Sequence, residues 1–248
     1  ALEVVRRSGI VVGVTTPTPP PGTARTVRER VRRELTREIT DVARRQLAES
    51  GSAALSLRAV ARELGMVSSA VYRYFPSRDD LLTALIVDAY TAVADAAEAA
   101  ETAVAREDFT GRWAATCAAV RSWARAHPQE YALIFGSPVP GYRAPVDTID
   151  PAARVPLLLM AVVVDARAQG RRGQEGEVPD PVRADLLALG AAIAPMLSAA
   201  DLARAVMGWT QLIGSISFEL FGHLHNVIHD YQAYFEFQMS EVAAGLGL

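Results

Sequence analysis

Apolar residues recur along most of the chain at intervals of three to five positions, the spacing of α-helices with one buried face. The first such stripe consists of Val27, Val31, Leu35, Ile39, Val42 and Leu47. Before it stand four prolines between Pro17 and Pro21, which disfavour both a helix and a central strand. We therefore predict a flexible N-terminal arm over residues 1–24 and a long first helix that ends at Gly51.

Proline positions help to place the later helices. Further apolar patterns predict helices over about 81–105, 109–126, 150–168, 199–221 and 228–244. His127-Pro128 ends one of them, because the residue before a proline is pushed out of the helical region. Asp150-Pro151 and Asp180-Pro181 are typical of a helix start, with Pro156 as an alternative start for the first of these two. Loops are expected over 136–145 and 170–179.

Two pairs of side chains predict capped helix starts. Ser77 with Asp80, and Ser198 with Asp201, have the three-residue spacing of a capping box. The sequence has no alternating strand pattern bounded by hairpin turns and no internal repeat. We therefore predict an all-α fold.

The most informative window covers residues 56–80. Ser56 would cap a short helix, and Ser68 or Ser69 would cap a second one. Between them, Gly65 can take the left-handed conformation that lets the chain reverse in about three residues. The inward-facing side chains would be Leu57, Val60, Ala61, Leu64, Val71 and Phe75. The window predicts a helix-turn-helix.

The charge of the chain is unevenly distributed. Residues 1–80 hold 14 arginines and 9 acidic residues, a net charge of +5, whereas residues 81–248 hold 11 and 19, a net charge of −8. A basic head on an acidic remainder indicates a nucleic-acid-binding head on a body with another task.

The outward face of the second short helix fits that role. It carries Ser68, Ser69, Tyr72 and Arg73, with Tyr74 beside them. These groups include hydroxyls and a guanidinium but no carboxylate, so the face can enter a major groove, donate to phosphates and reach base edges. The alternative is a pair of short packing helices with a polar surface.

The stretch from about Arg28 to Leu82 resembles the N-terminal domain of the tetracycline-repressor (TetR) family. The resemblance rests on the sequences at 59–65 (Ala-Val-Ala-Arg-Glu-Leu-Gly), 67–75 (Val-Ser-Ser-Ala-Val-Tyr-Arg-Tyr-Phe) and 76–82 (Pro-Ser-Arg-Asp-Asp-Leu-Leu). Arg78 stands where the family more often has lysine, which keeps the charge. The resemblance implies a DNA-binding domain over residues 25–80 and an effector-binding and dimerisation domain over residues 81–248.

The resemblance also implies DNA contacts. Phosphate contacts are expected from Ser56, Tyr72, Tyr74 and Arg78, and base or near-base contacts from Arg58, Ser68, Ser69 and Arg73. The alternatives are that the two tyrosines only pack the small domain and that the two serines only cap a helix. Arg25 and Arg28, placed before the first helix, are candidates for a minor-groove or backbone arm.

The C-terminal region carries a second, weaker resemblance. Residues 209–222 are similar to a subgroup named for a Trp-x-x-x-His-Gly (WHG) motif, with Ile213 in place of the histidine. In such proteins the last two helices pair with their copies in a four-helix interface, which implies a homodimer. The apolar residues that support this pairing are Ile216, Leu220, Tyr231, Tyr234, Phe235 and Met239.

The resemblance further implies a repressor that leaves its operator when a small molecule binds. The Trp, Phe and Met side chains of the later helices predict that this effector is apolar or weakly polar. Seven large residues of the later helices are either core or cavity lining: Trp113, Trp123, Tyr131, Phe135, Met160, Trp209 and Phe218. From these we select Trp113, Trp123 and Phe135 as the predicted effector site, with no cofactor.

Other functions are less well supported. His223, His225 and His229, with Glu219, suggest a metal-responsive regulator, although Gly222 indicates a helix end among them. A ligand-binding helical protein without operator binding is a further alternative. Enzymatic signatures are missing, which predicts that the protein is not an enzyme.

Cysteine usage and hydropathy predict a cytoplasmic protein. A single cysteine, Cys117, excludes a disulfide within one chain. No apolar run reaches 18 residues, and the N-terminal one is too short for a secretion signal, so no membrane is expected as a partner.

Overall fold

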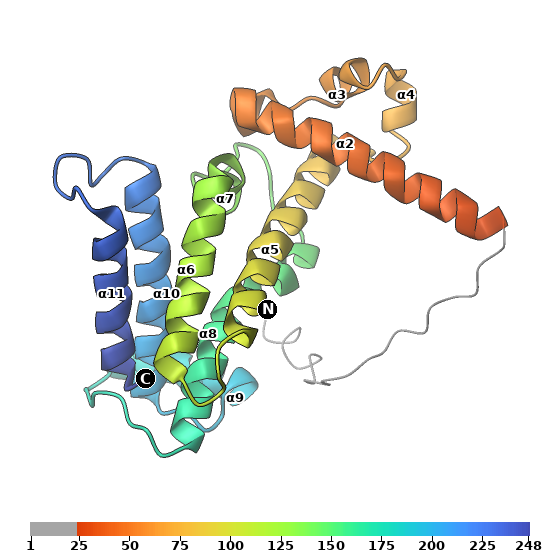
Figure 1. Ribbon diagram of the computed structural model, residues 1–248. Helices are drawn as coiled ribbons and strands as arrows, with labels where there is room; N and C mark the ends of the chain where they lie inside the picture. The colour runs from red at the N-terminus through yellow and green to blue at the C-terminus, as the bar shows by residue number, and fades with distance from the viewer. Residues whose placement is uncertain (1–23) are drawn as a thin grey trace. The chain divides into compact units, whose positions relative to one another are not determined.

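The computed structural model describes residues 24–248, in which every regular element is helical (Figure 1). The helices are α2 (Ala24–Ala54), α3 (Leu57–Glu63), α4 (Ser68–Val71), α5 (Arg78–Thr102), α6 (Phe109–Ala126), α7 (Pro128–Phe135), the short 3₁₀ helix η1 (Val146–Thr148), α8 (Ile149–Ala168), α9 (Asp180–Ile193), α10 (Ala199–Leu220) and α11 (Tyr231–Leu246). The all-α prediction is confirmed. The predicted arm lies outside the described residues except for Ala24, which begins α2. No helix of the described range is long and apolar enough to cross a membrane.

The described residues form two compact units. The head unit comprises residues 24–89 and 129–148, and the body unit comprises residues 90–128 and 149–248. The helix α5 contributes to both, because its first part lies in the head unit and its second part in the body unit. The segment 129–148 leaves the body sequence to join the head unit and then returns.

The head unit is built on α2, which bends at Gly51. This glycine has a φ of 73° and a ψ of 170°, so the regular helix ends there, as predicted. The chain then forms α3, α4 and the start of α5 around one apolar cluster, whose buried members are Ile39, Val42, Ala43, Leu55, Leu57, Val60, Ala61, Val71, Phe75, Leu81, Leu82 and Leu85. Five of the six inward positions predicted for the helix-turn-helix are buried, and Leu64 packs against the cluster from its edge.

The segment 129–148 is fastened to this cluster by apolar and polar contacts. Leu133, Val139 and Tyr142 pack against it, and the Tyr142 hydroxyl lies 2.9 Å from Thr83 Oγ1. Arg44 of α2 donates through Nε to Glu130 of α7 at 3.1 Å. The head unit therefore depends on residues far beyond the helix-turn-helix window.

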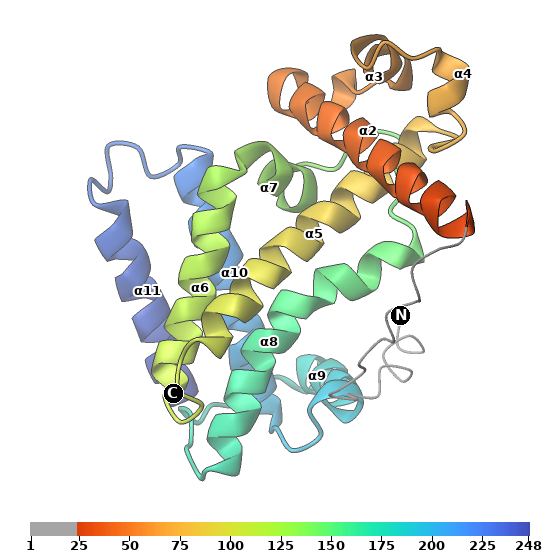
Figure 2. The ribbon, with the colours of Figure 1, turned by 45° about the vertical axis from the view of Figure 1, so that its right-hand side comes forward.

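The body unit is organised around α10, which packs against α6, α8, α9 and α11. Figures 1 and 2 both place α11 beside α10, and the turned view brings α8 and α9 forward. The largest fully buried apolar side chains of this unit are Trp113, Leu202, Leu212, Ile216 and Leu246. Most of this core comes from α6, α8, α10 and α11.

Buried ion pairs join the body helices as well. The Arg112 side chain has no exposed surface, and it donates to Glu101 Oε1 at 2.6 Å and to Asp165 Oδ2 at 2.8 Å. Arg121 binds both carboxylate oxygens of Glu219, at 2.6 and 2.9 Å. Fully buried arginines need such partners, because an unpaired charge in a protein interior is costly.

Several predicted helix ends are confirmed. The helix α6 spans Phe109–Ala126 and ends before His127-Pro128. Ser198 and Asp201 form the predicted capping box of α10, with each side chain bound to the backbone N–H of the other residue. At the start of α5, Ser77 Oγ accepts from Asp80 N at 3.1 Å.

Predictions of other helix starts are wrong or incomplete. His127-Pro128 stops one helix, but Pro128 also begins α7, because proline is tolerated in the first turn. The helix α8 starts at Ile149 and contains Pro156, so the alternative start is excluded. Pro179 precedes α9 without a side-chain cap from Asp180. The last helix begins after Asp230, whose carboxylate accepts from Ala233 N at 2.9 Å.

Candidate functional site

The turn between α3 and α4 has the geometry that the sequence predicts. Gly65 has a φ of 65°, and the chain around it closes with Met66 N donating to Ala61 O at 2.9 Å. A Cβ at Gly65 would meet no atom within 4 Å, so the glycine is needed for its backbone conformation alone. Two short helices with a common buried side therefore present their outer sides to solvent.

The caps of these two helices differ from the prediction. Ser56 occupies the N-cap position of α3, but its side chain makes no capping hydrogen bond. Val67 occupies the N-cap position of α4, so Ser68 and Ser69 are the first two helical residues. The hydroxyls of Ser56 and Ser69 therefore do not form the predicted capping hydrogen bonds.

The exposed face of α4 and its continuation carries several of the predicted contact residues. Ser69 and Arg73 are exposed, Tyr72 is 41% exposed, and Ser68 is half-buried. Arg58 is exposed on α3, two residues after Ser56. No carboxylate occurs between residues 64 and 78, so the face combines hydroxyl and guanidinium donors without an opposing charge.

Two predicted contact residues also have structural partners. Tyr74 is half-buried against the apolar cluster of the head unit. Arg78 donates through Nη2 to Ser52 O at 2.6 Å and through Nε to Leu55 O at 3.2 Å. Its guanidinium therefore binds backbone carbonyls at the end of α2 and after it, beside the bend at Gly51.

Ion pairs compensate several carboxylates of the head unit. Glu63 accepts from Arg45 Nη2 at 2.9 Å and from Gln46 Nε2 at 3.1 Å. These hydrogen bonds, that from Arg45 first, lower the pKa of the exposed Glu63 carboxyl. Burial raises the pKa of Asp88 even though Arg44 lies 3.3 Å away. The acidic groups are thus held by α2 and are absent from the exposed face of α4.

The body unit contains an apolar cavity of about 460 Å³ between α8, α9 and α10. Its lining consists of Ile149, Asp150, Ala153, Arg154, Pro156, Leu157, Met160, Leu189, Ile193, Ala205, Val206 and Trp209. Arg154 is neutralised by Glu98, at 2.7 and 2.9 Å, and by Asp95 at 2.6 Å. These partners, Glu98 first, raise the pKa of Arg154. The cavity has a size that suits small organic ligands, and its wall is apolar apart from Arg154 and Asp150.

The predicted effector residues lie elsewhere. Trp113 and Trp123 are buried on α6, and a Cβ added to Gly208 of α10 would come within 2.8 Å of the Trp113 ring. Phe135 is half-buried on α7 in the head unit, where its ring centroid lies 5.1 Å from that of Tyr131. None of the three lines the cavity, whereas Met160 and Trp209 from the larger set of seven do. The α9 residues of the lining, Leu189 and Ile193, were not predicted from the sequence, because the spacing of apolar residues is the same for a cavity wall and for ordinary core.

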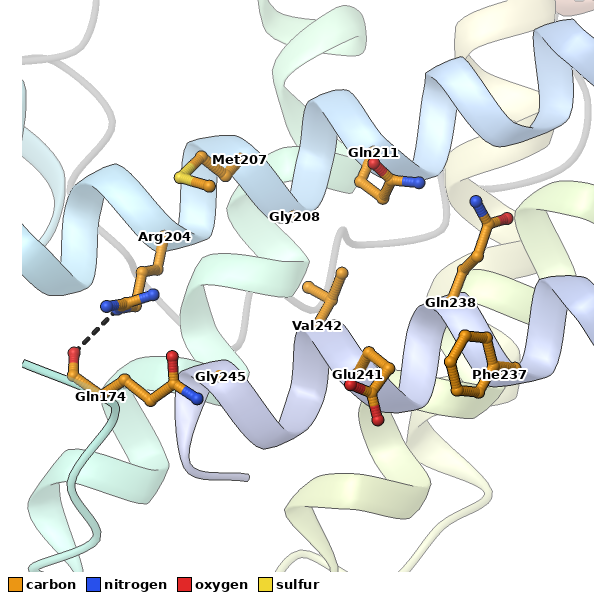
Figure 3. Close-up of a pocket in the computed structure, with 10 residues that line it drawn as sticks. All are labelled: Gln174, Arg204, Met207, Gly208, Gln211, Phe237, Gln238, Glu241, Val242 and Gly245. Atoms are coloured by element: carbon orange, nitrogen blue, oxygen red, sulfur yellow. Dashed lines mark hydrogen bonds between the residues drawn. The ribbon is translucent and has the colours of Figure 1, made fainter.

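A second space lies along the outer side of α10 and α11 (Figure 3). This groove of about 440 Å³ is lined by Gln174, Arg204, Met207, Gly208, Gln211, Phe237, Gln238, Glu241, Val242 and Gly245. Met207 and Phe237 are 62% and 59% exposed. In Figure 3 the side chains of α10 and α11 face the same open side, and Arg204 binds the backbone oxygen of Gln174 at 2.7 Å.

The three clustered histidines lie beyond the end of α10. His223, His225 and His229 are all exposed, and the chain there has positive φ values at Gly222 and Asn226. Within residues 24–248 no group of three or more His, Cys, Asp or Glu side chains is arranged to hold a metal ion. Cys117 is buried on α6, and burial raises the pKa of its thiol.

Comparison with known proteins extends the observations on both units. Residues 39–85 match the family model described as bacterial regulatory proteins, tetR family. Residues 113–242 match the family model described as a tetracyclin repressor-like C-terminal domain. The second match includes the stretch 209–222, whose similarity to the Trp-His-Gly subgroup stays a prediction.

Individual relatives agree with these matches. The chain is 39% identical over 197 residues to the HTH-type transcriptional regulator Rv1816 of Mycobacterium tuberculosis (strain ATCC 25618 / H37Rv), with 79% of this chain and 84% of the relative covered. The crystal structure of SCO4313 has a TM-score of 0.72 and 39% identity, and covers 91% of this chain and 98% of its own. A protein of unknown function from Rhodococcus sp. RHA1 has the same fold, with a TM-score of 0.67, 23% identity and coverage of 86% and 96%.

Proposed function

The chain belongs to the TetR family of DNA-binding transcriptional regulators, and we propose that it represses transcription from an operator that it leaves when a small molecule binds. In this proposal residues 25–80 carry DNA binding, and residues 81–248 carry effector binding and dimerisation. A cytoplasmic location is part of the proposal, because operator DNA of the bacterial relatives is found there.

The observation that carries the DNA-binding proposal is the exposed face of α4. Ser69 lies on α4, Tyr72 and Arg73 lie on the turn that continues it, and Val71 fixes the other side of the helix in the core. A short helix held in this way can enter a major groove without unfolding the head unit. We assign base contacts to Arg58, Ser68, Ser69 and Arg73, and phosphate contacts to Ser56, Tyr72, Tyr74 and Arg78.

The proposal for Arg78 needs one refinement. Its Nε and Nη2 already bind backbone carbonyls, and its Nη1 lies 3.8 Å from Asp79. A phosphate contact would therefore use Nη1, while the other two nitrogens hold the guanidinium in place. Such a fixed guanidinium loses little side-chain freedom when it binds DNA.

Fluorescence anisotropy with a labelled duplex from the upstream region of the protein's own gene tests operator binding. We expect tight binding at low salt and weaker binding to a duplex of scrambled sequence. Arg73→Ala should weaken operator binding, whereas Arg125→Ala, the same charge change on the exposed surface of the body unit, should not. Failure of the unaltered protein to bind any duplex would favour the ligand-binding protein without operator binding.

We place the effector in the cavity between α8, α9 and α10. The neutralised Arg154 and the apolar lining favour an uncharged, largely apolar molecule. The helix α5 belongs in part to each unit, so a ligand-induced shift of α5 would change the position of the head unit, with a coupling of about 1–3 kcal/mol. By reciprocity, operator DNA would weaken effector binding by the same factor.

Thermal-shift screening of apolar compounds tests this placement. A true effector should raise the melting temperature and lower operator affinity in the same preparation. Val206→Trp, at the cavity rim, should abolish both effects, while Val182→Trp, at an exposed position of α9 outside the lining, should preserve them. A stabilising compound that binds equally well with and without operator is not the inducer.

We propose that a second copy of the chain covers the groove on α10 and α11. Met207, Phe218 and Phe237 are each more than half exposed, and together they form an apolar surface on these two helices. The residues first chosen as support are partly core, since Ile216, Phe235 and Met239 are buried within one chain.

Analytical ultracentrifugation tests the dimer. Phe237→Glu should convert the protein to a monomer, because a carboxylate would be buried without a partner in the interface. Val227→Glu, at a more exposed apolar position after α10, is the matched control and should remain dimeric. A monomeric unaltered protein at micromolar concentration would contradict the proposal.

A further inference from the structure

A small basic pocket lies on the head unit between α2 and the residues that follow α4. It has a volume of about 370 Å³ and is lined by Arg28, Val31, Arg32 and Tyr74. The prediction that Arg25 and Arg28 precede the first helix is wrong, because α2 begins at Ala24. Arg28 therefore projects from a regular helix, and a helix holds its Cα in a defined position.

The arrangement of the three polar side chains is set by local geometry. Arg28 and Arg32 are four residues apart, so they lie one above the other on the same face of α2. The Arg32 guanidinium carbon lies 5.6 Å from the centroid of the Tyr74 ring, within the range of a cation–π contact. Tyr74 is itself fixed, because its backbone N donates to Val71 O at 2.9 Å and its side chain packs on the apolar cluster.

The charge in this pocket has no counterpart among the residues that the structure describes. None of its four lining residues is acidic, and neither arginine forms an ion pair with a residue of the described range. The nearby Arg30, by contrast, points along another side of α2 and pairs with Glu34 at 4.0 Å. Two guanidinium groups and a phenol hydroxyl thus supply several hydrogen-bond donors and two positive charges around one small space.

We propose that this pocket binds a phosphodiester of the DNA backbone beside the groove that α4 enters. The planar guanidinium fork matches the oxygens of a phosphate, and Tyr74 keeps the Arg32 fork in place. Tyr74 directly follows Tyr72 and Arg73 in the chain, so the pocket adjoins the face assigned to base recognition. This inference rests on the proposed DNA binding and adds to it a phosphate site built jointly by α2 and the end of the helix-turn-helix.

The salt dependence of DNA binding provides the test. Each phosphate contact contributes about 0.9 to the slope of log K against log salt concentration. Arg28→Gln and Arg32→Gln should each reduce the slope by about that amount, on the operator and on a duplex of scrambled sequence alike. Arg30→Gln is the matched control, because it removes the same charge from an exposed position of the same helix; its slope should stay close to that of the unaltered protein.

The role of the tyrosine is tested separately. Tyr74→Phe keeps the ring under Arg32, whereas Tyr74→Leu removes it, so the leucine variant should lose more affinity. Circular dichroism melting of each variant establishes that the head unit is folded at the assay temperature.

Two results would overturn the inference in distinguishable ways. Slopes for Arg28→Gln and Arg32→Gln equal to that of Arg30→Gln would remove the phosphate site while leaving the DNA-binding proposal intact. An unaltered protein that binds no duplex at low salt would remove both.

Discussion

The head and body units use the same basic residue for different purposes. In the head unit Arg58 and Arg73 lie on the surface with their guanidinium groups open to solvent. In the body unit Arg112, Arg121 and Arg167 are 0%, 6% and 11% exposed, and each binds a carboxylate. An arginine that is already neutralised inside the protein cannot bind a phosphate, whereas an open one can.

This difference explains the charge distribution of the sequence. The body unit places acidic residues where its arginines are buried, and Glu98 and Asp95 also neutralise Arg154 beside the cavity. The head unit keeps carboxylates away from α4 and binds several of them to α2. Substitutions in both units test how far each unit depends on these separate uses.

The largest effect is expected in the body unit. Arg112→Met should lower the free energy of unfolding by about 3–5 kcal/mol, because Glu101 would remain buried without its closest partner. Urea unfolding followed by circular dichroism measures this loss. Arg125→Met removes an exposed arginine 3.5 Å from Glu219 and should cost less than about 1 kcal/mol. Equal losses in the two variants would show that burial does not set the energy of these pairs.

Arg78→Ala is expected to have the next largest effect and combines both uses of arginine. Loss of its hydrogen bonds to Ser52 O and Leu55 O should lower the free energy of unfolding by about 1.5–3 kcal/mol. Binding to operator and scrambled duplexes should fall together. Arg58→Ala should leave unfolding within about 0.5 kcal/mol of the original value. Unchanged stability of the Arg78 variant would mean that the two carbonyl bonds contribute nothing.

Arg73→Ala tests an arginine that is exposed to solvent. Its stability should hardly change, but discrimination between operator and scrambled duplex should fall by about 1–3 kcal/mol if the side chain reads a base edge. Tyr72→Phe is the comparison variant and should weaken both duplexes by a similar factor, because phosphates occur in every sequence. A uniform loss for Arg73→Ala, measured by anisotropy competition, would reassign Arg73 to the backbone.

The smallest effect concerns acid stability. Burial raises the pKa of Asp201, but hydrogen bonds from Arg167 and Ser198 lower it by more, so the net shift is downward. A carboxyl whose pKa is lowered in the folded state stabilises the fold at pH values above its ordinary pKa of about 3.9. This stabilisation is lost as the pH falls from there through the lowered pKa. As the pH is lowered from about 6 to 3, the urea midpoint should therefore fall more steeply for the unaltered protein than for Asp201→Asn.

Glu63→Gln sharpens the acid comparison. The pKa of Glu63 is also lowered, by Arg45 and then by Gln46, but this carboxyl lies on the surface of the head unit. Its substitution should change the acid profile less than Asp201→Asn does. The reverse order would contradict the view that the body unit depends more strongly on its ion pairs.

Local signals made the helix-turn-helix predictable from the sequence. Gly65 must reverse the chain, and the apolar spacing around it fixes which side of each helix is buried. Ser198 with Asp201 similarly marks the start of α10 within four residues. The four-residue length of α4 was not predictable, because its continuation through Tyr72 to Tyr74 forms turns that the pattern does not separate from a helix.

Long-range features of the sites were not predictable. Arg112 and Asp165 are 53 positions apart, and nothing near either residue indicates burial. Trp113 and Trp209 are both large aromatic residues within helices, yet one belongs to the core and the other lines the cavity. Such choices depend on which helices pack together. The helix α7 was not predicted for a local reason, because a proline after a helix indicates its end and here also begins the next helix.

The return of residues 129–148 to the head unit has a consequence for protein synthesis. A growing chain releases Arg44 long before Glu130, and Thr83 long before Tyr142, so the head unit acquires its last contacts only after residue 148 has emerged from the ribosome. A chain that stops earlier leaves the apolar surface under Leu133 and Val139 uncovered. Abortive translation products would therefore lack a complete DNA-binding head and would be poor competitors for the operator.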